Sequence, residues 1–441
     1  MTWNVVTLAG TSDKFKAKLN GHDESLTVPF DILGHRDVVQ SSLVDVLSKY
    51  SLLLSPAAHD LLNASIAAYT ADVRVPRKQA YENWTRDIRL FLAVREMSVW
   101  LKAARTFERL LSFLTGDHWT VEVREAPKSY KFEPRKKRRK TIEISAKTVC
   151  LFSGGLDSFI GAVDELERVG NVALVGHHSA GGGPTSKSQD LALQALRIAY
   201  GEDISPFLQF WISPPKGVER VSETTTRGRS ILFLGLGVAV ASALSARRLV
   251  VPENAVISLN VPLTEARLGS YTTRTTHPHV ISLVRRLIGE LGLDVEIDLP
   301  YRFHTKGEMI SSCTNQDLIK PGLKATMSCS HPGANRFTAK DANIHCGYCV
   351  PCIIRRAAIR ASVKRDSTKY AFSDLSQPLS EKRGSDLRAL KLALNRYRVR
   401  PSRIADLLAA GPLRVSDDEL SNYLNVFTRG LNEVGRFLGR Y

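Results

Sequence analysis

The hydrophobic pattern of the first third of the chain combines two periods. Alternating apolar and polar positions indicate half-buried strands, and apolar positions three to four residues apart indicate amphipathic helices. The strands are predicted at 84–94 and 118–126, and the helices at 38–50, 57–70 and 98–116, the last ending at Gly116. We therefore expect residues 1–130 to form an α+β domain, followed by a linker rich in proline and basic residues.

From Thr141 onward, nearly continuous apolar runs alternate with helical patterns. Strands are predicted at 147–152, 172–178, 207–213 and 295–301, helices at 157–169, 186–200, 230–247 and 280–292, with a further apolar segment at 250–260. Apolar strands that alternate with helices are typical of a doubly wound parallel sheet, which binds ligands at the carboxyl ends of its strands. Residues 353–441 are predicted to be mostly helical.

Composition agrees with a globular protein of two or three domains, because 43% of its 441 residues are hydrophobic and 24% are charged. The N-terminus lacks the layout of a signal peptide. The longest apolar run, 231–246, is shorter than the roughly 20 residues of a membrane span and is bracketed by Arg229 and Arg247. We expect a cytoplasmic protein with no membrane partner.

Positive charge gathers in two segments. The net charge is +17, of which 131–140 contributes +6 from seven basic residues and one acidic, and 353–441 contributes +9 from 18 basic and nine acidic residues. These segments are interpreted either as a solvated linker and an arginine-rich helical surface, or as a surface for nucleic acid or an acidic partner.

The hexapeptide SGGLDS, which begins at Ser153, lies where a predicted strand gives way to a helix. Gly154 and Gly155 allow a sharp turn and a close approach of the backbone to an anion at the helix N-terminus. Ser153 and Ser158 can donate hydrogen bonds, and Asp157 is expected to face a Mg²⁺ ion held by the phosphates. The lysine of a P-loop is missing, but amides and hydroxyls suffice to hold a pyrophosphate.

SGGLDS resembles the SGGxDS signature of the PP-loop ATP pyrophosphatase family, with Leu156 at the variable position. The family cleaves ATP between its α and β phosphates, holds the pyrophosphate in this loop and transfers AMP to a substrate oxygen. Gly228 and Arg229 resemble the family's Gly-Arg-Asn segment, with Ser230 in place of the asparagine. The resemblance implies that Arg229 faces the nucleotide phosphates or the substrate carboxylate, and that Asp157, Ser158 and Arg229 are catalytic.

Four of the six cysteines lie close together in the sequence. They are Cys329 and the three of CGYCVPC, namely Cys346, Cys349 and Cys352. Two overlapping C-x-x-C units and one cysteine upstream can complete a tetrahedron of thiolates. A closed set of four thiolates favours zinc in a structural role, and an iron–sulfur cluster is the alternative.

A spaced cysteine followed by C-x-x-C-x-x-C after a PP-loop domain resembles QueC, which adenylates the carboxylate of 7-carboxy-7-deazaguanine and adds ammonia to form 7-cyano-7-deazaguanine. The resemblance covers roughly 147–360. The additional N-terminal domain, the basic tail and 253–279 resemble the QatC group of QueC-like proteins from bacterial antiphage operons. That resemblance implies transfer of the activated deazaguanine acid to the N-terminus of a partner protein from the same operon.

Three further side chains lie in segments that the pattern places near the ligand edge of the sheet. Lys187 follows the second strand and is either a solvated loop lysine or a contact for phosphate or substrate. His277 and His279 are either structural or close to substrate. The sequence leaves both readings open.

Together these features predict an ATP-dependent ligase that uses ATP, Mg²⁺ and Zn²⁺. The predicted parts are an α+β domain at 1–130, a basic linker and first strand at 131–146, an ATP-binding domain at 147–325, a zinc segment at 326–362 and a basic helical region at 363–441. The alternatives are a synthase that uses ammonia, a tRNA-modifying PP-loop enzyme whose basic segments hold nucleic acid, and a non-catalytic interaction module that binds nucleotide.

Overall fold

The computed structural model describes most of the chain. The described residues are 1–30, 39–130, 142–202, 204–215, 223, 225, 227–264, 274–332, 344–363, 365–376 and 379–439. The basic run at 131–140 lies outside them, so its role as a linker stays a prediction, as does the division of the chain into domains.

The first 130 residues form a sheet of four strands in the order β2-β1-β4-β5, all of them parallel. The strands are β1 (Thr2–Ala9), β2 (Glu24–Phe30), β4 (Asp87–Val94) and β5 (His118–Glu125), and the helices are α1 (Leu43–Lys49), α2 (Pro56–Arg74), η1 (Arg77–Gln79) and α3 (Met97–Thr115). The strands predicted at 84–94 and 118–126 are confirmed, but a wholly parallel sheet makes this part α/β, and the expectation of α+β was wrong.

The pattern missed β1 because polar side chains are buried in it. Asn4 and Thr7 are almost completely buried, and both donate to backbone carbonyls, Asn4 to Glu24 and Thr7 to Phe91. Satisfied buried polar groups of this kind disturb the apolar run that marks a buried strand.

The second sheet has the order β10-β9-β6-β7-β8-β3 and is parallel except for β3 at its edge. Its strands are β3 (Gln40–Ser41), β6 (Thr148–Leu151), β7 (Val172–His178), β8 (Phe207–Ser213), β9 (Arg248–Val250) and β10 (Glu296–Asp298). The predicted parallel sheet is therefore confirmed. The apolar segment 250–260 contains only the end of β9 and continues as a short helix.

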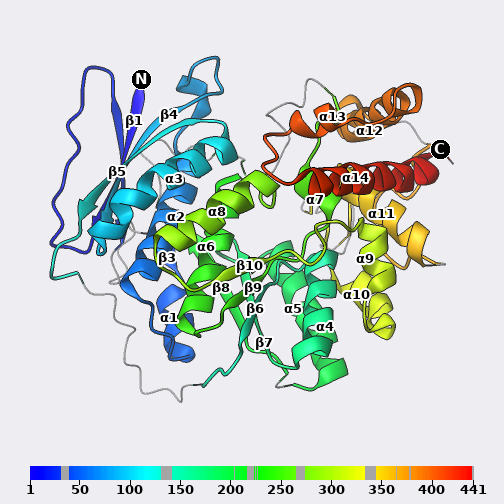
Figure 1. Ribbon diagram of the computed structural model, residues 1–441, viewed down its shortest axis with the longest axis horizontal. Helices are drawn as coiled ribbons and strands as arrows, with labels where there is room; N and C mark the ends of the chain where they lie inside the picture. Colours follow the sequence, from blue (N-terminus) through cyan, green and yellow to red (C-terminus); the bar gives the residue numbers. More distant parts are fainter. Residues whose placement is uncertain are drawn as a thin grey trace.

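Helices cover both faces of this sheet (Figure 1). Their bounds are α4 (Leu156–Val169), α5 (Pro184–Tyr200), α6 (Arg227–Ala243), α7 (Ala255–Leu259) and α8 (Pro278–Glu290). In β6, Val149 and Leu151 belong to a core shared with α6, α8, α2 and α3, whereas Cys150 belongs to a core shared with α4 and α5. The first of these cores continues into the N-terminal sheet.

The remaining helices gather on the C-terminal side of the molecule, where α11, α12 and α14 pack together (Figure 1). They are α9 (Lys306–Ser312), η3 (Gln316–Leu318), α10 (Ile319–Ala325), α11 (Val350–Ser362), α12 (Glu381–Val399), α13 (Ile404–Leu408) and α14 (Asp417–Leu438). The predicted helical character of 353–441 is confirmed. Within the described part of the chain, no helix has the length and apolarity to cross a bilayer.

The start of α6 is held by a buried carboxylate from α2. Asp72 accepts hydrogen bonds from the amide of Gly228 at 2.7 Å and from the hydroxyl of Thr225 at 3.0 Å. Its other oxygen accepts from the fully buried Arg86 at 2.7 Å. An acid at this end of a helix satisfies a free amide and complements the helix dipole. Because of this contact α6 begins three residues before the predicted 230, and Arg229 lies in its first turn.

Replacing Asp72 should therefore weaken the whole fold. We expect Asp72→Ala to lower the free energy of unfolding by about 3 to 5 kcal/mol, because it leaves Arg86 buried with less compensation. Thermal and urea unfolding measure the loss. As a control, Glu122→Ala removes an exposed ion pair with Arg89 and should cost no more than ~1 kcal/mol. Equal losses in the two variants would contradict the role of Asp72.

Candidate functional site

SGGLDS forms the tight turn between β6 and α4. Gly154 has a positive φ of 82°, and a Cβ atom there would lie 2.6 Å from the hydroxyl of Ser188, so only glycine fits. The amide of Gly155 donates to Ser153 at 3.3 Å, and the hydroxyl of Ser158 donates to the carbonyl of Gly155 at 2.9 Å. The hexapeptide is thus a compact loop at the N-terminus of a helix, as predicted.

The loop lies where the strand order reverses. From β6 the chain proceeds to β7 and β8 on one side, and then returns to β9 and β10 on the other. In open α/β sheets such a switch point forms the ligand crevice. The side chain of Asn254, which follows β9, donates to Asp157 at 2.7 Å. This hydrogen bond joins the segments that follow β6 and β9 at the switch point.

A lysine from a distant helix approaches the loop. The ammonium group of Lys306, the first residue of α9, donates to Asp157 in a salt bridge. The side chains are only 5% and 13% exposed, respectively. Thr305 and Glu308 form a capping box that fixes this end of α9. The sequence reasoning missed Lys306, although Thr-x-x-Glu does indicate a helix start.

Glu253 lies beside this pair and accepts a hydrogen bond from Thr276. Removal from water raises its pKa to about 7, and the negative charge of Asp157 adds to the effect. Beside the loop, one acid is therefore paired with a cation, and a second gains a proton near neutral pH.

Arg229, in the first turn of α6, contacts the carboxyl end of β7. Its guanidinium donates to the carbonyl of His177 at 2.9 Å and to the ring of the same residue at 3.3 Å. Gln189 donates to that carbonyl and to the carbonyl of Phe152 at the end of β6. Burial lowers the pKa of Arg229. Arg229 is thus connected to the loop through His177 and Gln189.

Three more of the residues predicted for the site are Lys187, His277 and His279. Lys187 is exposed on the first turns of α5, next to Ser188, which touches Gly154. His277 and His279 both pack on the ring of Phe113 in α3, with centroids 5.3 and 4.8 Å away. Burial lowers the pKa of His277 to about 3. Substrate contacts by these residues stay predictions.

The segment before the first cysteine of the cluster lies on the loop. The amide of Met327 donates to the carbonyl of Gly154 at 2.9 Å, and Ser328 accepts from the amide of Leu156 at 3.5 Å. Arg355, a fully buried residue of α11, donates to Ser328 at 3.1 Å. Through these contacts α11 supports one side of the loop.

The four cysteines come together as predicted. Cys329, Cys346, Cys349 and Cys352 have sulfur atoms that all lie within 4.8 Å of one another. The sulfurs of Cys346 and Cys352 are 3.8 Å apart, which is about the edge of a tetrahedron with Zn–S bonds of about 2.3 Å. Hydrogen bonding with the neighbouring thiols lowers the pKa of Cys329. The cluster could thus hold a metal ion such as zinc.

The arrangement can stabilise negative charge on a ligand. A glycine turn at a helix N-terminus, the buried ammonium of Lys306 and the half-buried guanidinium of Arg229 all lie near the carboxyl ends of β6, β9 and β7. In a site shielded from water, such donors stabilise phosphate or carboxylate oxygens strongly.

No protein-family model matches the sequence, and a comparison with curated proteins also gives no match.

The raised pKa of Glu253 predicts a dependence of stability on pH. Between about pH 4.5 and 7 the folded state retains a proton that the unfolded chain has lost, so the contribution of Glu253 to stability falls as the pH rises. We expect Glu253→Gln to gain stability relative to the wild type across this window. Urea unfolding at several pH values measures the difference. A constant difference between the two proteins would contradict the assignment.

The cysteine cluster predicts that metal content and stability fall together. Cys349→Ser should lower both the zinc bound per chain and the thermal midpoint, because a structural zinc site contributes folding free energy. Metal analysis and thermal unfolding provide the two readouts. Cys313→Ser is the control, since this buried thiol lies outside the cluster and its loss should leave the zinc content unchanged. A zinc-replete Cys349 variant would remove this residue from the ligand set.

Proposed function

We propose that the protein is an ATP-dependent carboxylate–amine ligase that forms AMP and pyrophosphate. One observation carries the proposal: the acid of SGGLDS, Asp157, lies at the switch point of the parallel sheet in contact with Asn254 and the buried Lys306. A phosphate-binding loop with a lysine beside it from a distant helix is suited to retaining a leaving pyrophosphate.

The residues of the crevice have separable roles in this reaction. Gly154 and Gly155 let the backbone approach the β and γ phosphates. The hydroxyls of Ser153 and Ser158 bond within the loop in this structure and would turn to donate hydrogen bonds to the phosphates. A substrate carboxylate oxygen attacks the α phosphorus, and the bond between that phosphorus and the bridging oxygen to the β phosphate breaks. Pyrophosphate departs with that oxygen. Hydrogen-bond donors of the loop stabilise the negative charge of the departing pyrophosphate.

Two cations complete the phosphate environment. When ATP binds, Lys306 can exchange its bond to Asp157 for one to a phosphate, and Asp157 would then face the Mg²⁺ that accompanies the nucleotide. The Mg²⁺ ion would neutralise part of the negative charge of the phosphates. Arg229 is suited to a paired hydrogen bond with the substrate carboxylate or the α phosphate.

In the second half of the reaction an amine attacks the acyl carbon of the adenylate. The acyl–oxygen bond breaks, AMP leaves with that oxygen and the amine loses a proton. We propose a 7-deazaguanine carboxylate as the acid, and the N-terminus of a partner protein in antiviral defence as the amine. Both assignments rest on the resemblance of SGGLDS and the four cysteines to QueC-like proteins. Ammonia and RNA are the competing acceptors.

The proposal is tested by incubating the purified protein with ATP, Mg²⁺ and 7-carboxy-7-deazaguanine. We expect AMP and pyrophosphate to appear only when the acid is present. Mass spectrometry of co-expressed candidate partners then detects an added deazaguanine mass at an N-terminus. Failure of every deazaguanine acid to give AMP would refute the ligase. If the acyl group is transferred only to ammonia or only to RNA, the proposal of a protein acceptor is wrong.

Asp157→Asn should abolish formation of AMP, because it removes the charge that holds Lys306 and faces Mg²⁺. The change also leaves Lys306 buried without its partner, which costs stability. The double variant Asp157→Asn/Lys306→Met removes both charges and should recover thermal stability without recovering activity. Activity near the wild-type level in either variant would contradict the role of Asp157.

A further inference from the structure

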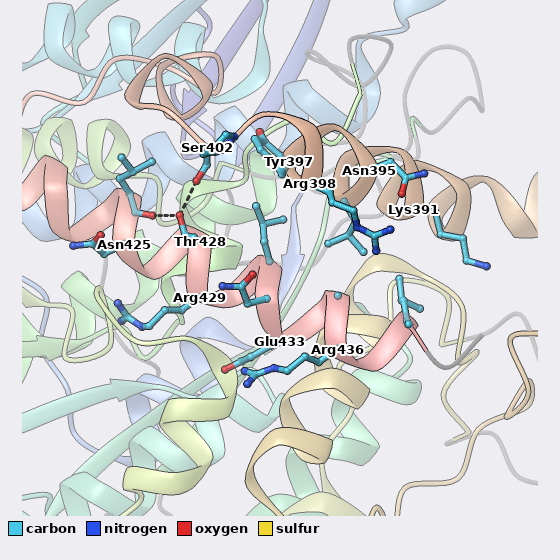
Figure 2. Close-up of a pocket in the computed structure, with 18 of the residues that line it drawn as sticks. Lys391, Asn395, Tyr397, Arg398, Ser402, Asn425, Thr428, Arg429, Glu433 and Arg436 are labelled. Atoms are coloured by element: carbon cyan, nitrogen blue, oxygen red, sulfur yellow. Dashed lines mark hydrogen bonds between the residues drawn. The ribbon is translucent and has the colours of Figure 1, made fainter.

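A cavity of about 990 Å³ lies between α12 and α14, apart from the residues of SGGLDS (Figure 2). The two helices supply most of its lining. Glu308 of α9 and the turn at Pro401 and Ser402 supply the rest. Its volume is at the upper end of the roughly 300–1,000 Å³ that is typical of ligand pockets.

Positive side chains from both helices line this cavity. They are Lys391 and Arg398 of α12, and Arg429 and Arg436 of α14 (Figure 2). Among the described residues of the lining, two are acids. Glu308 is paired with Arg429 at 2.6 Å, and Glu433 is buried and accepts a hydrogen bond from Thr305. The cavity therefore carries an excess of positive charge, and Arg398 and Arg436 are exposed to solvent.

The neutral part of the lining favours a peptide over a nucleic acid. Asn395, Asn425 and Asn432 present amides, which can donate to and accept from a peptide backbone. Single-stranded nucleic acids are usually held by stacking on aromatic rings. Among the described lining residues the aromatic one is Tyr397, and its ring already packs edge-on against Phe427, with centroids 5.6 Å apart.

We propose that this cavity binds an acidic peptide segment of a partner protein. Carboxylates of the segment pair with Lys391, Arg398 and Arg436, while the asparagine amides bond its backbone. The segment lies next to the helix that carries Lys306, because Glu433 in the cavity wall holds Thr305 at the start of α9. The proposal depends on the cavity and not on the ligase reaction.

The test uses the full chain without ATP and a fluorescein-labelled peptide of alternating glutamate and glycine as the probe. We expect saturable binding, followed by fluorescence anisotropy, that weakens by about tenfold or more in Arg398→Gln/Arg436→Gln. Lys102→Gln/Arg105→Gln is the matched control, since it removes two exposed positive charges from α3 and should change the affinity by less than about twofold.

Three results would overturn the proposal: no binding of the peptide, equal weakening in both double variants, or a labelled single-stranded RNA that competes for the cavity and binds it more tightly. Thermal unfolding of each variant checks that the fold is retained. Because binding is measured without nucleotide, a negative result leaves the ligase proposal standing, and loss of ligase activity leaves this one standing.

Discussion

The carboxylate of Asp72 is the constraint on which the arrangement of the site depends. It is completely buried, and it bonds Arg86, the residue before β4, with one oxygen and the first turn of α6 with the other. A buried acid is stable only with such partners. The same contact sets where α6 begins, and therefore where Arg229 lies relative to the carboxyl ends of the strands.

The SGGLDS loop is likewise held from outside its own strand and helix. Lys306 of α9 contacts Asp157 on one side, and Ser328, bonded by Arg355 of α11, contacts Leu156 on the other. The cysteine cluster lies at the start of α11, so a metal ion there would stabilise the helix that supports the loop. Lys306 thus brings an ammonium group to a loop that has no lysine of its own.

Much of this could be predicted from local patterns. The parallel sheet follows from its apolar strands, the loop from SGGLDS and the thiol cluster from the spacing of Cys346, Cys349 and Cys352. What could not be predicted depends on contacts between distant residues. The bonds from Asp72 to Gly228 and from Lys306 to Asp157 span 156 and 149 positions, and no periodicity encodes them. The parallel N-terminal sheet was not predicted, because the buried polar residues Asn4 and Thr7 interrupt the apolar pattern of β1.

The hydrogen bond between Asp72 and Gly228 also affects the chain during its synthesis on the ribosome. A ribosome that adds about 5–20 residues per second would synthesise Gly228 about 8 to 30 s after Asp72, because the two are 156 residues apart. During this interval the apolar face of α2 has no α6 to cover it. Exposed apolar surface of this kind favours aggregation, and slow translation between the two residues would prolong the exposure.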